Sequence, residues 1–174
     1  MRPPLQPVAP SIDDPIELLQ ACHDKVRHFA ALSLRLRNHL AKQGIDTQAQ
    51  EAATSILRYF DLAAPLHHDD EEQDLFPALR TLGSAKLCAR IDQVESEHED
   101  LNRLWQVVRP WLHAIASGHA CDAPTEVEIF ATSYPAHADR EEADIYPAAA
   151  ALQAIQVKLI SEAMVMRRTL GQAP

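Results

Sequence analysis

The chain has 174 residues, of which 47% are hydrophobic and 24% are charged, a length and composition typical of one soluble domain with a substantial core. Acidic residues outnumber basic ones by 25 to 16, giving a formal net charge of −9 at pH 7, which argues against a nucleic-acid partner or an anionic membrane surface. The four glycines leave no room for a glycine-rich phosphate-binding loop.

The apolar spacing predicts an all-α chain. Residues 1–13 contain four prolines and are expected to form a disordered leader. A helix then begins at Asp14-Pro15, a capping residue followed by a proline suited to the first helical position, and runs to Gly44. Similar patterns predict helices over residues 47–76, 84–117, 124–146 and 147–170. We therefore expect residues 14–174 to form an antiparallel four-helix bundle with an extra C-terminal helix.

The N-terminal sequence and the cysteine pattern indicate in which cellular compartment the protein is expected. No apolar run approaches the ~18 residues that a membrane-spanning helix needs, and the first ten residues lack the apolar stretch of a secretory signal. The three cysteines, Cys22, Cys88 and Cys121, are odd in number and show no CxxC spacing, which argues against disulfides and thiolate metal sites. We therefore expect a cytoplasmic protein without a membrane partner.

A fourteen-residue motif occurs twice in the chain. Residues 65–78 read PLHHDDEEQDLFPA and residues 135–148 read PAHADREEADIYPA, with eight of the fourteen positions identical. Each copy contains a histidine followed four residues later by a glutamate, and these pairs are His67 with Glu71 and His137 with Glu141. Two copies of such a pattern are not plausibly accidental.

Two further histidines repeat with the motif. His23 lies 44 residues before His67, and His98 lies 39 residues before His137. His23 and His98 each occupy an otherwise apolar helical stripe that must face the core. The chain is therefore interpreted as a duplicated helical hairpin, in which the first two helices match the third and fourth.

The repeated residues are suited to binding metal ions. Helical residues four apart lie on the same face, so each pair places an imidazole nitrogen beside a carboxylate. Carboxylates without partners in a bundle core are costly, and two cations bridged by them would remove that cost. Imidazole and carboxylate without thiolate favour iron, with manganese or zinc as alternatives. The predicted metal ligands are His23, His67, Glu71, His98, His137 and Glu141.

Polar neighbours of these residues have less defined roles. His68, Glu72 and Glu142 adjoin predicted ligands but point about 100° away around the helix, which favours an outer or exposed position. Asp74 and Asp144 recur in both copies. They either orient ligand imidazoles from outside or belong to a solvated face.

The paired H-x-x-x-E segments, each followed by [LI]-[FY]-P, resemble the hemerythrin-like, or HHE cation-binding, family over about residues 14–148. The resemblance implies a four-helix bundle that holds two non-haem iron ions on the six residues named above. It further implies that Glu71 and Glu141 bridge the irons and that a solvent-derived oxo or hydroxo group forms a third bridge.

The ligand pattern differs from that of oxygen-carrying hemerythrins. Those proteins have a second histidine four residues from the one in the third helix, where this chain has Val94 and Asn102. The set of four histidines and two glutamates is more similar to di-iron proteins that repair iron–sulfur clusters after nitrosative or oxidative stress.

The resemblance implies a small ligand: oxygen, nitric oxide or peroxide. It is consistent with a reactive protein that works with an unidentified redox partner, in iron handling or cluster repair. A non-catalytic module that senses oxygen or binds iron is the alternative, and a bundle stabilised by zinc is a third reading. The sequence leaves open whether the protein is an enzyme.

Overall fold

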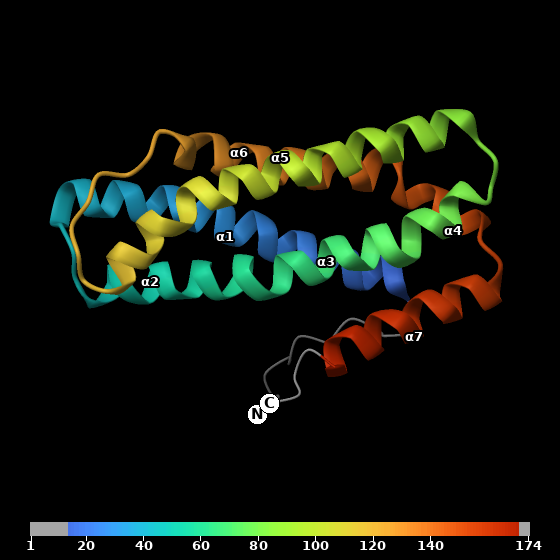
Figure 1. Ribbon diagram of the computed structural model, residues 1–174, viewed down its shortest axis with the longest axis horizontal. Helices are drawn as coiled ribbons and strands as arrows, with labels where there is room; N and C mark the ends of the chain where they lie inside the picture. The colour runs from blue at the N-terminus through green and yellow to red at the C-terminus, as the bar shows by residue number, and fades with distance from the viewer. Residues whose placement is uncertain (1–13, 171–174) are drawn as a thin grey trace, which may run out of the picture.

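The computed structural model describes residues 14–170, so the predicted leader lies outside the described residues. Within this range the chain is helical throughout its regular structure, as predicted (Figure 1). Four long segments run side by side in alternating directions, and the final helix lies outside them. The predicted helical bundle with an additional C-terminal helix is confirmed.

The first hairpin begins with α1 (Pro15–Gln43). The Asp14 side chain accepts hydrogen bonds from the backbone N–H groups of Ile16 and Glu17, which caps the helix where the sequence predicts. The helix ends at Gly44, whose φ of 75° favours glycine. The returning segment runs through α2 (Thr47–Arg58), the π-helical turn η1 (Tyr59–Ala63), α3 (Ala64–Asp70), a second π-helical turn η2 (Glu71–Leu75) and α4 (Phe76–Arg80).

The interruptions in this returning segment lie close to two prolines. A proline inside a helix lacks the N–H for the usual backbone bond and clashes with the preceding turn. Pro65 and Pro77 each lie two residues beyond the end of a π-helical turn, where the widened backbone relieves this clash. The predicted end of the helix at Phe76 is wrong, because Pro77 falls in the first turn of α4 and the helix continues to Arg80.

The second hairpin consists of α5 (Ala85–Ala116) and α6 (Glu126–Asp144). The helix predicted from Pro147 begins later than expected. Residues Tyr146–Ala151 form the 3₁₀ helix η3, with Pro147 in its first turn, and α7 (Ala154–Leu170) follows. The second copy of the motif therefore ends in a 3₁₀ helix, whereas the first copy contains a π-helical turn.

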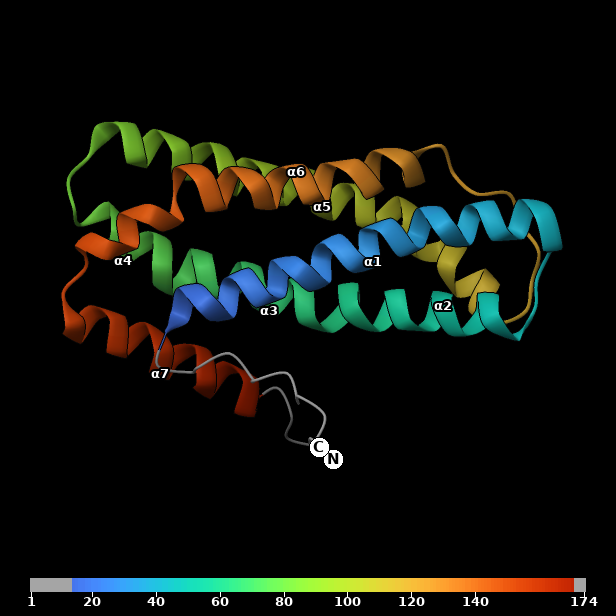
Figure 2. The same ribbon diagram turned by 180° about the vertical axis from the view of Figure 1, so that it is seen from behind.

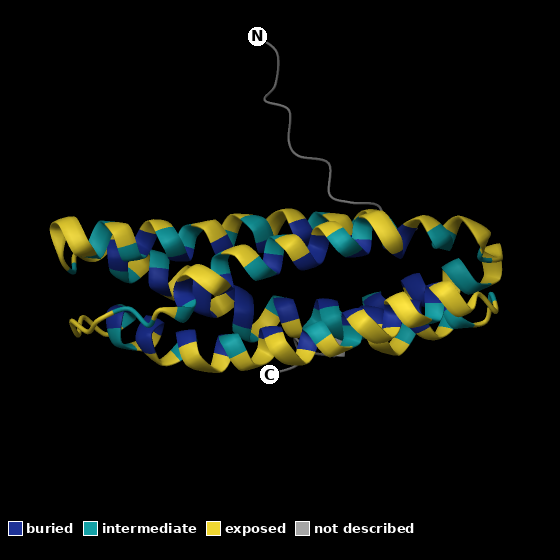
Figure 3. Ribbon diagram, turned by 90° about the horizontal axis from the view of Figure 1, so that it is seen from above, coloured by how far each residue is buried: buried dark blue, intermediate teal, exposed yellow. Residues whose placement is uncertain are grey.

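The helices form a closed ring with buried side chains inside. α1 contacts α2 and α6, and α5 contacts the same two helices. Buried residues line the inner faces of the long helices and exposed residues the outer faces (Figure 3). α7 packs against α1, α3 and η2 from outside the ring, as the opposite view also shows (Figure 2). Among residues 14–170, no helix combines the length and apolar character needed to span a membrane.

The apolar core is divided by a polar layer. Along α1, Leu19 belongs to one buried apolar cluster and Val26 to another, and His23 lies between them. Along α5, Val94 belongs to the same cluster as Leu19 and Leu101 to the same cluster as Val26, and the buried His98 lies between them. The two clusters therefore close the polar layer from both ends of the bundle and limit its contact with water.

Candidate metal centre

All six predicted ligands lie in this buried layer. None is more than 4% exposed, and the carboxylates of Glu71 and Glu141 are fully buried. Their backbones belong to all four segments of the ring, and the residues are His23 on α1, His67 on α3, Glu71 at the start of η2, His98 on α5, and His137 and Glu141 on α6. The structure thus brings together side chains that are distant in sequence, as the duplicated pattern predicts.

Glu141 lies at the centre of the layer. Its Oε2 lies 3.0 Å from Nε2 of His23, and its Oε1 lies 3.1 Å from Nε2 of His137 and 3.3 Å from Nε2 of His98. Three of the predicted imidazole ligands therefore direct Nε2 toward one carboxylate. The fourth is His67, whose Nε2 lies 3.0 Å from that of His23.

Glu71 approaches the same centre from the opposite hairpin. Its Oε2 lies 3.5 Å from Nε2 of His67 and 3.5 Å from Nε2 of His98. Its Oε1 accepts a 2.6 Å hydrogen bond from the hydroxyl of Tyr146, a buried residue of η3. The Tyr146 hydroxyl also lies 3.1 Å from Nε2 of His23. Sequence reasoning missed this tyrosine, although the motif carried a signal, since Phe76 holds the matching position in the first copy.

Three carboxylates hold the outer sides of the imidazole rings. Glu142 lies 2.7 Å from Nδ1 of His23, Glu72 lies 2.6 Å from Nδ1 of His98, and Glu97 lies 2.9 Å from Nδ1 of His137. An ionised carboxylate only accepts hydrogen bonds, so in a neutral imidazole each of them favours the proton on Nδ1 and leaves the Nε2 lone pair facing the centre. This is the tautomer that binds metal ions.

These contacts decide two predictions left open by the sequence. Glu72 and Glu142 occupy the outer position expected of them, and each contacts a histidine of the other hairpin. Glu97 was not predicted, because no repeat marks it. Asp74 and Asp144 do not orient these imidazoles: the first bonds Arg167 of α7, and the second lies 3.7 Å from Arg90 of α5.

The charges of the layer are strongly coupled. Burial alone would raise the pKa of Glu141, but its close contacts with His137, His23 and His98 hold that pKa well below its usual range. Burial and the charge of Glu141 raise the pKa of Glu71 well above its usual range. Burial opposes the charged form of His98, yet hydrogen bonds to Glu141 and Glu72 raise its pKa to about 9. Glu71 and Glu141 can therefore both be ionised only if positive charge lies between them. Protonated histidines or bound metal ions would supply that charge.

The inward-facing atoms fit metal ions. Oε2 of Glu71, Oε2 of Glu141 and Nε2 of His137 are buried and make no properly directed hydrogen bond within the described range. Such atoms are costly to bury unless a partner is present. The donor atoms of His23, His67, Glu71 and Glu141 all lie within 4.8 Å of one another, close enough to surround one ion. Nitrogen and carboxylate oxygen together suit iron, manganese or zinc.

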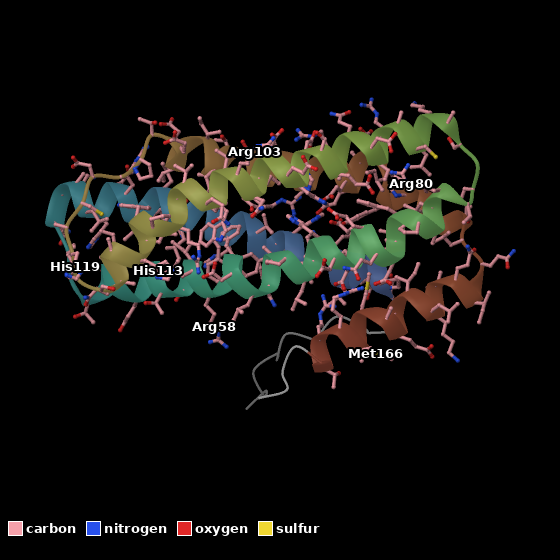
Figure 4. All side chains as sticks on the ribbon, in the orientation of Figure 1. Arg58, Arg80, Arg103, His113, His119 and Met166 are labelled. Carbon is pink, nitrogen blue, oxygen red and sulfur yellow. The ribbon has the colours of Figure 1, made fainter. Side chains whose placement is uncertain are left out.

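His68 is half-buried and lines a pocket at the side of the polar layer. Its donor atom lies within 4.8 Å of donor atoms of His98 and His137. By contrast, His113 and His119 lie at the end of the bundle where α5 terminates, far from α4 and its Arg80 (Figure 4).

A pocket of about 470 Å³ opens beside His68. His68, His98 and Glu72 line it, together with Tyr134 and acidic residues that include Asp69 and Glu99. The pocket is large enough for a small molecule and lies next to the polar layer.

Residues 14–149 match the sequence profile of the family described as hemerythrin HHE cation binding domain. The match spans the six predicted ligands and both copies of the motif, and it ends before α7. A relative from Haemophilus influenzae, named an uncharacterized protein, is 37% identical over 131 residues, which cover 75% of this chain and 76% of the relative.

Proposed function

Because the chain belongs to the hemerythrin HHE cation-binding domain family, we propose that it is a non-haem di-iron protein that binds or reacts with oxygen, nitric oxide or peroxide. One observation carries the proposal. Two copies of a His/Glu pair and two lone histidines meet in a single buried layer, where inward-facing atoms have no properly directed hydrogen bonds. A structural ion pair would not require six such groups.

Each protein group has a role in this proposal. The Nε2 atoms of the four histidines and the carboxylates of Glu71 and Glu141 would hold the ions. When bound, iron supplies one-electron steps between the ferrous and ferric states, which the side chains of this layer cannot supply. Manganese and zinc are the alternative metals.

The remaining residues of the site position and shield the ligands. Glu72, Glu97 and Glu142 orient three imidazoles through Nδ1, and Tyr146 holds one oxygen of Glu71. The two apolar clusters exclude bulk water from both ends of the layer. The pocket beside His68 leaves one side open to a small molecule.

We propose that this reactivity serves iron handling or iron–sulfur cluster repair in the cytoplasm, with a redox partner still to be identified. Cys22, Cys88 and Cys121 are free thiols, which suits a reducing compartment. These three residues lie outside the proposed ligand set.

A sensing or iron-binding module is the second candidate. It is favoured by the contact between the site and α7, since Asp70 directly precedes Glu71 and accepts hydrogen bonds from Arg167 and Arg168. A change at Glu71 on metal or ligand binding would therefore reach α7. Turnover of nitric oxide or peroxide distinguishes a reactive protein from such a module.

The decisive experiment measures metal content and the optical spectrum of purified protein before and after anaerobic reduction. We expect two irons per chain and a near-ultraviolet band from a bridging oxygen that bleaches on reduction. Adding oxygen, nitric oxide or peroxide separately to the reduced protein identifies the oxidant that restores the band.

Two variants control this experiment. Glu141→Ala removes a carboxylate from the centre and is expected to lose iron, whereas His113→Ala removes an exposed histidine at the far end of α5 and is expected to retain both irons. A single zinc, or no metal, in the unmodified protein would overturn the di-iron proposal.

A further inference from the structure

The hydroxyl of Tyr134 differs from those of the other two tyrosines of the chain. Tyr59 donates a hydrogen bond to the backbone carbonyl of Cys22, and Tyr146 donates one to Glu71. Tyr134 is only 3% exposed, yet its hydroxyl makes no hydrogen bond to another residue in the range 14–170. A buried donor without a partner costs free energy unless water or a ligand satisfies it.

The hydroxyl of Tyr134 opens to the pocket beside the polar layer. Unlike the unpartnered polar atoms of that layer, its oxygen is not enclosed by protein atoms. The residue lines the pocket together with His68 and His98. Its ring packs against Phe60 and Phe130 in edge-to-face contacts, with centroids 4.9 Å from each. These contacts hold the ring in place, so the hydroxyl has a defined position in the wall of the pocket.

Tyr134 adjoins the layer of predicted ligands and keeps its proton. It lies one turn before His137 on α6, and both residues are buried, as expected for residues on one face of a helix. Burial raises the pKa of Tyr134 above its ordinary value of 10.0. The hydroxyl is therefore a hydrogen-bond donor, not a phenolate, at neutral pH.

Carboxylates dominate the remaining polar lining of the pocket, and they are already engaged. Asp61 accepts hydrogen bonds from Trp105 and Arg109, and Glu72 lies 2.6 Å from Nδ1 of His98. Ionised carboxylates cannot donate a hydrogen bond to a ligand, and their charge repels an entering anion. The pocket is therefore suited to a neutral molecule that carries a hydrogen-bond acceptor.

We propose that Tyr134 donates a hydrogen bond to a small neutral acceptor molecule, nitric oxide or dioxygen, in the pocket beside His98, and so positions that molecule at the metal centre. Ferrous iron gives electron density to such a molecule, which strengthens its acceptor atom. The hydroxyl therefore favours diatomic molecules that become more negative on binding. This inference rests on the proposed di-iron function, and it assigns ligand selection to a residue outside the metal-ligand set.

The test uses nitric oxide and the reduced, iron-loaded protein under anaerobic conditions. Infrared spectra in H₂O and D₂O measure the N–O stretching frequency, and a trapping reagent measures the rate of release. In the unmodified protein the frequency is expected to differ between the two solvents, because the hydroxyl proton exchanges. Tyr134→Phe is expected to abolish this difference and to release nitric oxide roughly 10-fold faster, with its iron content unchanged.

Two variants serve as controls. Tyr59→Phe removes a buried hydroxyl that already has a partner, the Cys22 carbonyl, and is expected to leave the solvent effect and the release rate unchanged. His68 is the competing donor within the pocket, and its ring stacks on that of His98, with centroids 3.9 Å apart. His68→Phe keeps a ring in this stack and is expected to retain the solvent effect. Iron content and thermal melting check that each variant is intact.

Each part of the experiment has an outcome that would overturn the inference. If the unmodified protein shows one frequency in both solvents, or if Tyr134→Phe retains the difference, Tyr134 does not bond the ligand, while the di-iron proposal stands. Loss of the difference in His68→Phe alone would assign the donor to His68. Equally fast release in Tyr59→Phe would place the effect in core packing. If the unmodified protein does not bind two irons, the proposed function fails first, and the inference fails with it.

Discussion

The residue that precedes the lone histidine differs between the two hairpins, Cys22 in the first and Glu97 in the second. Glu97 lies 2.9 Å from Nδ1 of His137 and accepts hydrogen bonds from Arg140. In the first hairpin, Nδ1 of His67 has no hydrogen-bond partner among the residues that the structure describes. One half of the layer is therefore held by an ion pair within its own hairpin, and the other half is not.

The first hairpin carries a buried charge instead. Asp70 occupies the place that Arg140 holds in the second copy, and it is fully buried. Burial raises its pKa even though Arg167 and Arg168 of α7 bond its carboxylate. A buried charge is tolerated only when another group supplies the counter-charge. Arg140 of the second copy pairs within its own hairpin, whereas Asp70 of the first copy depends on a helix added after the repeat.

Metal removal tests the proposed metal centre, to which both hairpins contribute ligands. It is expected to change the free energy of unfolding more than any of the substitutions below. Ligands that bind only the folded state stabilise it by about 4 kcal/mol each at 1,000 times Kd. Chelation of both ions is therefore expected to lower the free energy of unfolding by about 8 kcal/mol and to lower Tm, because Glu71 and Glu141 then face each other without cations. Thermal and urea unfolding of the loaded and chelated protein measure this. Equal melting temperatures would place these carboxylates outside a metal site.

Removing the ion pairs between Asp70 and the two arginines of α7, Arg167 and Arg168, tests the difference between the hairpins. Arg167→Ala combined with Arg168→Ala leaves the buried Asp70 carboxylate without a counter-charge, which is expected to cost about 3–5 kcal/mol in urea unfolding. The matched control is Arg140→Ala. Its ion pair with Glu97 is more exposed, so a loss of about 1 kcal/mol or less is expected. Similar losses for the two changes would remove the distinction between the hairpins.

Substitution of Tyr146 tests whether its hydrogen bond to Glu71, which Phe76 at the matching position of the first copy cannot make, supports metal binding. Tyr146→Phe removes the hydrogen bond to Oε1 of Glu71 and restores the residue type of the first copy, Phe76. Loss of an outer partner of a ligand typically weakens metal binding by about 10–100-fold, and Fe(II) titration measures this. Tyr59→Phe is the matched control, because its hydroxyl donates to the backbone carbonyl of Cys22. An unchanged affinity in Tyr146→Phe would mean that this bond does not support a ligand.

Substitutions at the helix caps are expected to have the smallest effect on stability. Asp46 accepts a hydrogen bond from the backbone N–H of Ala49 at the start of α2, which lowers its pKa below the ordinary value of 3.8. The cap therefore contributes stability above that value and loses it as pH falls through the lower pKa of the folded state. Thr125, at the start of α6, makes no side-chain cap bond.

Acid unfolding of the two cap variants measures this difference. Asp46→Ala is expected to lower the free energy of unfolding near neutral pH and to remove part of its acid dependence, whereas Thr125→Ala is expected to change neither. An Asp46 carboxyl that titrates in the folded protein as it does in the unfolded chain would contradict this expectation.

Local sequence patterns were enough to predict the helices, the duplicated hairpin and the six side chains that the structure gathers in one layer. These features follow from local rules, since the spacing of apolar residues and of the H-x-x-x-E pairs defines a face on each helix. The same rules located the caps of α1, but they misplaced the end of the helix at Phe76, because a proline is also compatible with the first turn of a continuing helix.

The surroundings of His68, Glu97 and Tyr146 and the contacts of α7 depend on how the helices pack together. Helical periodicity gives the angle of a side chain around its own axis, but not which neighbouring helix lies at that angle. His68 points away from His67 and still reaches His98, because α3 has buried neighbours on two sides. Asp70 and its arginines lie almost a hundred residues apart, and no local pattern relates them. Their pairing depends on desolvation of a buried charge, which exists only once the helices have packed.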